Sequence, residues 1–144
     1  MKLQTSSATI SFAKKLEEEA ANFYQELAQK YAEGKDSFLF FATENRKNGV
    51  QIQRAYYSTI TDAIEGCFVF EIDSREYEIE TSREDEASYA DALAKTIEIE
   101  EKMERFYEDA AEQSKSLMAD ISRTFVRIAK KRGERIAKLK ALQG

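Results

Sequence analysis

The sequence of 144 residues contains no proline and only five glycines, so it lacks most of the residues that interrupt helices. At an average usage near 5%, a chain of this length would contain roughly seven prolines. Apolar residues recur at the three- and four-residue spacing that places side chains on one helix face, and 34% of the residues are charged. These features predict long amphipathic helices in a single domain spanning residues 1–144, because the chain is long enough for one core and too short for two.

Polar capping residues and glycines predict where the helices begin and end. Ser6 or Ser7 is expected to cap the first helix, and Gly34 is expected to follow its end. Asp36 or Ser37 is expected to cap the second helix. The helices predicted in this way cover residues 7–33, 36–64, 85–113 and 116–142.

Residues 66–85 follow a different pattern, in which apolar and mostly polar residues alternate. The apolar positions of this alternation are Phe68, Phe70, Ile72, Tyr77 and Ile79. Alternation is typical of extended chain lying on a surface, so we interpret the segment as a long, partly strand-like crossover. Short connections elsewhere predict two antiparallel helical hairpins, and a long crossover allows the second and third helices to run parallel. The expected fold is an all-α four-helix bundle.

Polar residues interrupt the apolar stripe of each predicted helix. They are Glu17 in the first helix, Asn45 and Asn48 in the second, Glu100 in the third, and Arg132 and Arg135 in the fourth. Helix bundles build metal and cofactor sites from inward-pointing polar side chains of facing helices. We therefore take these six residues as the candidate site.

An internal repeat relates the two predicted hairpins. The segments LEEEAANFYQELA (16–28) and IEEKMERFYEDAA (99–111) both place a glutamate seven residues before a tyrosine, as Glu17 with Tyr24 and Glu100 with Tyr107. The second helices of the hairpins match more faintly, as SFLFFATENRKN and TFVRIAKKRGER. The repeat supports two related hairpins.

These motifs resemble the rubrerythrin-like branch of the ferritin-like superfamily, over essentially the whole chain. The resemblance implies a ferritin-like bundle whose di-iron centre is held by a glutamate on the first and third helices and by Glu-x-x-His on the second and fourth. Glu17 and Glu100 match the first pattern, and Tyr24 and Tyr107 are the implied neighbours of the site. The second pattern is broken: Asn45 and Arg132 stand at the two Glu positions, and Asn48 and Arg135 stand at the two His positions.

The substitutions favour a site without iron. In the family's site, as the resemblance implies it, four carboxylates balance two ferrous ions, whereas here Arg132 and Arg135 would balance Glu17 and Glu100. We therefore expect no bound iron, no redox activity, and a structural, regulatory or partner-binding role. In a competing interpretation the two arginines extend to solvent and the glutamates lie at the polar edge of their helices.

In a second alternative the protein is an active enzyme. In it the protein is a di-iron oxidoreductase or ferroxidase acting on peroxide or ferrous iron, with iron held by Glu17, Glu44 and Glu100 and unusual supplementary ligands. Two features weigh against it. Glu44 is predicted to share a helix face with Ser37, Phe40 and Gln51, away from the apolar stripe, and the chain has no histidine.

Charge and hydropathy limit the expected partners. The net charge is −5, which disfavours nucleic acid as a partner. Residues 123–140 nevertheless hold eight basic residues and one acid, and residues 71–112 hold sixteen acidic and five basic residues. We interpret both runs as pairing between the third and fourth helices. No stretch approaches the ~18 uncharged apolar residues of a membrane span, so we expect a soluble, cytoplasmic protein.

An apolar patch predicts self-association. Leu39 and Phe40 lie off the apolar stripe of the second helix, and Tyr56 and Tyr57 follow further along it. Exposed apolar patches often mark subunit contacts, and the family resemblance implies a dimer. We expect a homodimer, and the sequence does not specify another protein partner. The single cysteine, Cys67, is expected to act as a small apolar residue.

Overall fold

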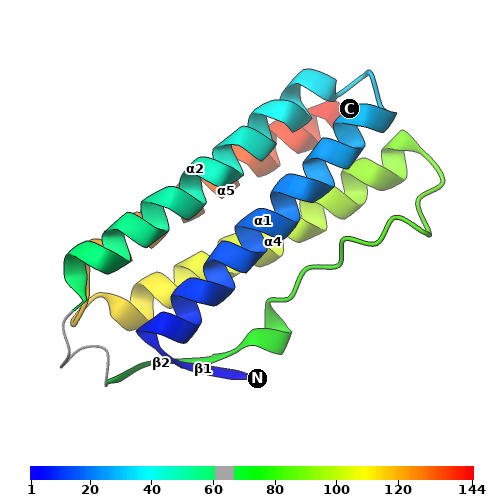
Figure 1. The fold of residues 1–144 in the computed structure, drawn as a ribbon. Coiled ribbons are helices and arrows are strands. Elements are labelled where there is room, and N and C mark those ends of the chain that lie inside the picture. The colour runs from blue at the N-terminus through cyan, green and yellow to red at the C-terminus, as the bar shows by residue number, and fades with distance from the viewer. Residues whose placement is uncertain (61–66) are drawn as a thin grey trace.

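The computed structural model describes residues 1–60 and 67–144. Those ranges contain four long helices and a two-stranded sheet (Figure 1). In chain order the elements are β1 (Lys2–Thr5), α1 (Ser6–Lys30), α2 (Lys35–Thr59), β2 (Phe68–Asp73), a short 3-10 helix (Ser74–Glu76), α4 (Tyr89–Ser114) and α5 (Ala119–Gln143). The predicted all-helical bundle is confirmed, with a small sheet added to it.

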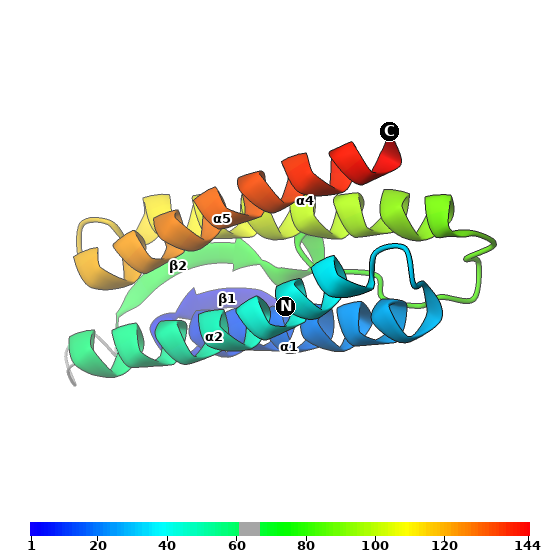
Figure 2. The same ribbon diagram turned by 90° about the horizontal axis from the view of Figure 1, so that it is seen from above.

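The four helices form two hairpins. α1 packs mainly against α2 and α4 mainly against α5, with residues 31–34 and 115–118 as the connections. In Figure 1, α1 and α5 run from lower left to upper right, whereas α2 and α4 run the opposite way. The segment between β2 and α4 travels along the bundle, as Figure 2 also shows. The two hairpins meet along one seam between α2 and α5 and a second seam between α1 and α4.

The sheet covers the seam between α1 and α4. β1 and β2 pair antiparallel, with Leu3 opposite Ile72; β1 lies against α1, and β2 lies against both α1 and α4. Leu3, Phe70 and Ile72 are buried. The alternation in the crossover correctly indicated extended chain, but no pattern in the sequence indicated β1. A four-residue strand at the chain terminus has too few alternating positions to be recognised, and its partner lies almost seventy residues away in the sequence.

The first helix differs from its predicted bounds at both ends. Thr5 caps it instead of Ser6 or Ser7, because its hydroxyl oxygen accepts a hydrogen bond from the Ala8 amide at 3.2 Å. The helix ends at Lys30 rather than residue 33. Tyr31 leaves the helix with extended backbone, is buried, and donates its hydroxyl to Glu86 at 2.7 Å. This contact across 55 residues, invisible to a local pattern, ends α1 early.

The remaining helices also begin at other residues than predicted. Gly34 precedes α2, and neither Asp36 nor Ser37 caps it. The described part of α2 ends at Thr59, and the predicted extension to residue 64 runs into residues 61–66, outside the described residues. Ser88 caps α4 by accepting from the Asp91 amide at 3.2 Å, so α4 begins four residues after position 85. α5 begins three residues after position 116.

Gly34 and Gly49 provide a matched test of packing at the α1–α2 turn. A Cβ at position 34 would lie 2.7 Å from the Tyr89 hydroxyl and 2.8 Å from the buried Phe38 ring, whereas a Cβ at position 49 would meet nothing within 4 Å. Gly34→Ala should lower the free energy of unfolding by about 1–3 kcal/mol through overpacking. Gly49→Ala, inside α2, should raise it by about 0.5–1 kcal/mol. Urea unfolding of both variants measures this, and equal effects would contradict the packing described here.

Candidate functional site

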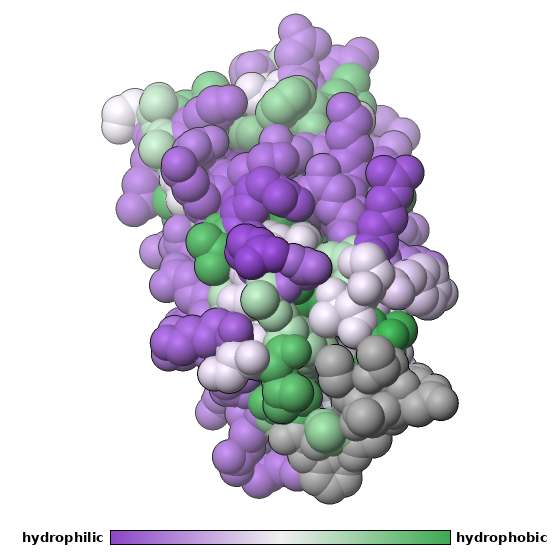
Figure 3. Space-filling view, turned by 90° about the vertical axis from the view of Figure 1, so that its left-hand side faces the viewer, coloured by the Kyte–Doolittle hydropathy of each residue, from purple (hydrophilic) through white to green (hydrophobic). Residues whose placement is uncertain are grey.

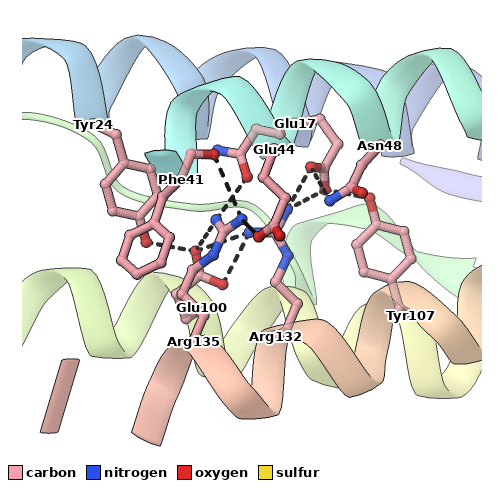
Figure 4. A network of polar contacts seen from close by, with 10 residues as sticks. Glu17, Tyr24, Phe41, Glu44, Asn48, Glu100, Tyr107, Arg132 and Arg135 are labelled. Atoms are coloured by element: carbon pink, nitrogen blue, oxygen red, sulfur yellow. Dashed lines mark hydrogen bonds and ion pairs between the residues drawn. The ribbon is translucent and has the colours of Figure 1, made fainter. Parts of the chain in front are cut away.

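All six candidate residues lie at one level of the bundle interior. Their exposed fractions are between 0% and 2%, and they come from all four helices: Glu17 from α1, Asn45 and Asn48 from α2, Glu100 from α4, and Arg132 and Arg135 from α5. Figure 4 labels all of them except Asn45 and shows a connected network, flanked at opposite ends by Tyr24 and Tyr107. The interpretation in which the arginines reach solvent is wrong. We call this set of residues, with Tyr24, Tyr107 and Glu44, the ionic cluster.

Arg132 joins the two hairpins through its guanidinium group. Its Nη1 donates to both carboxylate oxygens of Glu100, at 2.9 and 3.0 Å. Its Nη2 donates to both oxygens of Glu17, with the Oε1 contact at 2.5 Å. One cation therefore pairs with a carboxylate from α1 and one from α4, with one guanidinium nitrogen on each carboxylate.

Arg135 makes a second bridge from α5. Its Nη1 donates to Glu100 Oε1 at 3.0 Å and to Asn45 Oδ1 at 2.7 Å. Its Nη2 donates to Glu44 Oε1 at 2.5 Å and to the Phe41 carbonyl at 3.5 Å. The guanidinium carbon also lies 4.6 Å from the centre of the Phe41 ring, where the ring face stabilises a cation. Arg135 thus ties α2 to α4.

The two tyrosines form a reciprocal pair of hydrogen bonds. Tyr24 on α1 donates to Glu100 on α4 at 2.6 Å, and Tyr107 on α4 donates to Glu17 on α1, also at 2.6 Å. Each tyrosine follows the glutamate of its own helix by seven residues but donates its hydrogen bond to the glutamate of the other helix. The residues that repeat in the sequence therefore make equivalent contacts in the two hairpins, which are related by an approximate two-fold symmetry.

The asparagines are only partly satisfied. Asn48 Nδ2 donates to Glu17 Oε1 at 3.3 Å, and Asn45 Oδ1 accepts from Arg135. Asn45 Nδ2, Asn48 Oδ1 and the Nε atoms of both arginines have no hydrogen-bond partner among the described residues. Buried polar atoms without partners destabilise a fold. The asparagines therefore leave part of the network's hydrogen-bonding capacity unused.

Mutual pairing keeps Glu100 and Arg132 ionised. Burial alone would raise the pKa of Glu100, but Arg132, Arg135 and the Tyr24 hydroxyl outweigh it and hold that pKa below its usual value. Burial would lower the pKa of Arg132, but Glu100 and Glu17 raise it well above its ordinary value. Burial, reinforced by the neighbouring glutamate, raises the pKa of Tyr24 well above its usual range. Arg132 is therefore charged and Tyr24 is a protonated donor at neutral pH.

Glu44 belongs to the ionic cluster, contrary to the prediction that it faces away. Its carboxylate pairs with Arg135, and its side chain is 20% exposed, whereas the side chains of Arg132 and Glu100 are fully buried. Helical spacing correctly places the Cβ of Glu44 off the apolar stripe. The long side chains of Glu44 and Arg135 nevertheless reach each other and pair. With Glu17, Glu44 and Glu100 against Arg132 and Arg135, the formal charges are three negative and two positive. Glu44 is the group by which the cluster contacts the surface.

The donor set does not fit a di-iron centre. Arg132 lies between Glu17 and Glu100, and Arg135 lies between Glu44 and Glu100, so each pair of carboxylates that iron would need is already bridged by a guanidinium group. Within residues 1–60 and 67–144, no three His, Cys, Asp or Glu side chains are grouped so that they could hold a metal ion. We derive no metal chemistry from this site.

Comparisons with protein-family models, with curated proteins and with solved structures gave no match to this chain. The resemblance to rubrerythrins therefore stays a prediction. No helix in the described part of the chain is both long and apolar enough to cross a membrane. Of the predicted dimer patch, Leu39, Phe40 and Tyr57 are exposed, whereas Tyr56 is half-buried against the core. The homodimer is also still a prediction.

Arg132 should be the most stabilising member of the cluster. Arg132→Ala would leave Glu17 and Glu100 buried without their shared cation, so the free energy of unfolding should fall by about 3–5 kcal/mol. Lys130→Ala, which removes an exposed cation two residues away, should change it by less than about 0.5 kcal/mol. Urea unfolding monitored by circular dichroism measures both, and a loss below about 1 kcal/mol for Arg132→Ala would mean that the bridge does not stabilise the fold.

Acid should selectively remove the contribution of Glu100. Because its folded-state pKa is depressed, its stabilisation is complete above the unfolded pKa of about 4.3 and is lost as the pH falls through the lower folded value. The difference in unfolding free energy between the wild type and Glu100→Gln should therefore be large at neutral pH and should shrink below about pH 4. Glu98→Gln, an exposed control on α4, should show no such trend. A pH-independent difference for Glu100→Gln would refute this assignment.

Proposed function

We propose that this protein is a degenerate member of the rubrerythrin-like, ferritin-like bundles, in which an ionic cluster replaces the di-iron centre. On this proposal it has no redox activity of its own and serves a structural, regulatory or partner-binding role. The observation that carries the proposal is the Arg132 guanidinium group, which binds Glu17 and Glu100 in the place where bridging iron would bind them.

The arrangement of the helices supports the comparison. Two antiparallel hairpins are joined by a crossover that runs along the bundle, so that α2 and α4 point the same way (Figures 1 and 2). One long crossover connection is also a feature of ferritin-like bundles, which supports the proposal. The reciprocal tyrosine bonds fit an ancestral pair of equivalent hairpins.

The electrostatics support the loss of metal. A divalent cation entering the cluster would meet two guanidinium groups, each hydrogen-bonded to carboxylates. If the metal took Glu17 and Glu100 from Arg132, the arginine would be left buried without a carboxylate partner, which is strongly unfavourable. The arginines therefore supply internally the positive charge that iron would supply in a metal-binding relative.

The alternative is a di-iron oxidoreductase or ferroxidase acting on peroxide or ferrous iron. One observation favours it: Glu44 reaches the cluster, so three carboxylates are present instead of two. They could serve iron only if Arg132 and Arg135 both left their present positions, and neither has another buried carboxylate to pair with among the partners described here. We therefore favour the protein without iron.

Restoring the ligands that the family resemblance implies tests the proposal. The variant Asn45→Glu, Asn48→His, Arg132→Glu, Arg135→His should bind about two Fe²⁺ or Co²⁺ ions per chain, since it would recreate the carboxylate and Glu-x-x-His set. The wild type should bind neither ion and should not turn over peroxide. Elemental analysis of desalted protein and Co²⁺ absorption spectra measure binding, and circular dichroism with metal present shows whether the variant is folded.

Two outcomes would overturn the proposal. If the wild type retains two irons and consumes peroxide, the chain is an enzyme. If the folded variant binds no more metal than the wild type, these four positions are not former ligand positions. As a control, the same substitutions at 45 and 48 alone should not create a site, because Arg132 and Arg135 would still occupy it.

A further inference from the structure

The seam between α2 and α5 is open to the surface, unlike the seam between α1 and α4. Three adjoining hollows of about 360, 440 and 460 Å³ run along the outer side of α2, and the first and last of these extend to α5. All three share Gln51 as a lining residue. No part of the sheet or of the described crossover packs extensively here. We call this surface the α2–α5 groove.

The groove carries basic side chains that have no acidic partners. Its cations without an ion pair in the described part of the chain are Arg46, Lys47, Arg54, Arg127 and Lys131. Its two acids are already engaged, Glu44 by Arg135 and Asp120 by Arg123. The basic run of α5 was expected to pair with α4, but ion pairs between these helices are formed only by Glu100 among the described residues. Arg127 instead donates to Gln51 on α2.

Large apolar side chains lie exposed among these cations. Leu39, Phe40 and Val50 line the groove and are 41%, 53% and 51% exposed. Figure 3 views the molecule from the left-hand side of Figure 1, the side toward which α2 ends, and shows hydrophobic side chains set among hydrophilic ones. A surface that combines unpaired cations with exposed apolar side chains is complementary to a ligand that is both anionic and apolar.

We propose that the α2–α5 groove binds an acidic amphipathic helix of a partner protein. Leu39 and Arg54 are separated by about 22 Å along α2 at a rise of about 1.5 Å per residue, which matches about four turns of a bound helix. The apolar face of such a helix would cover Leu39, Phe40 and Val50, and its acidic flanks would meet the cations. This proposal does not depend on whether the ionic cluster replaces a di-iron centre.

Two other occupants fit less well. A second copy of this chain offers an acidic surface on α4 and the crossover, but none of the large exposed apolar residues lies in the described part of those segments. Two copies meeting groove to groove would place like charges together. Duplex nucleic acid would satisfy the cations but would leave the three exposed apolar side chains without a complementary surface.

Fluorescence anisotropy with synthetic probes tests the proposal on the whole protein. The probe is a labelled helical peptide of about five turns with leucine along one face and glutamate on the others. The matched probe has the same composition in scrambled order, and the third probe is a labelled DNA duplex. At about 0.15 M salt, the amphipathic peptide should bind at least about tenfold more tightly than the scrambled peptide or the duplex.

Variants locate the binding surface. Arg54→Glu and Val50→Asp should each weaken binding of the amphipathic peptide about tenfold or more, since both residues are exposed and line the groove. Lys15→Glu, the same change of charge at an exposed position of α1, should not. Unchanged circular dichroism spectra establish that the variants are folded. No binding, equal binding of the scrambled peptide, tighter binding of the duplex, or equal loss with Lys15→Glu would overturn the proposal.

Discussion

A guanidinium group buried between two carboxylates is the interaction on which this bundle depends. Removing Arg132, Glu17 and Glu100 from water has a high desolvation cost, which is recovered only if all three charges meet with good hydrogen-bond geometry. That requirement fixes α1, α4 and α5 relative to one another, because each contributes one member. Apolar packing alone tolerates small shifts of one helix against another, whereas a buried cation hydrogen-bonded to two carboxylates does not.

The surrounding polar groups follow from this constraint. Each carboxylate still has lone pairs after binding Arg132, and a tyrosine from the opposite hairpin donates to each of them. Tyrosine suits this position because its ring adds to the apolar core while its hydroxyl satisfies a buried charge. The asparagines of α2 are less well matched and leave Asn45 Nδ2 and Asn48 Oδ1 unpaired. The network is thus tightest between α1, α4 and α5.

Helical spacing was sufficient to identify the six buried polar residues but not the complete cluster. Glu17 and Glu100 interrupt apolar stripes, which marks them as buried in any helical bundle. Glu44 was named only as an alternative iron ligand and was expected to face away from the stripe, because its position on the helix describes its Cβ and not the reach of its carboxylate. β1 and the early end of α1 were missed for a related reason: the β1–β2 pairing and the Tyr31–Glu86 hydrogen bond are tertiary contacts that no local pattern contains.

Glu44 links the buried cluster to the α2–α5 groove. It lines the groove and at the same time accepts a hydrogen bond from Arg135, which is in turn bound to Glu100. A helix bound in the groove would lie beside this carboxylate. Because Arg135 holds α2 to α4 through that carboxylate, binding at the surface and the internal ion pairs share one residue. The ionic cluster is thus continuous with the groove surface through Glu44.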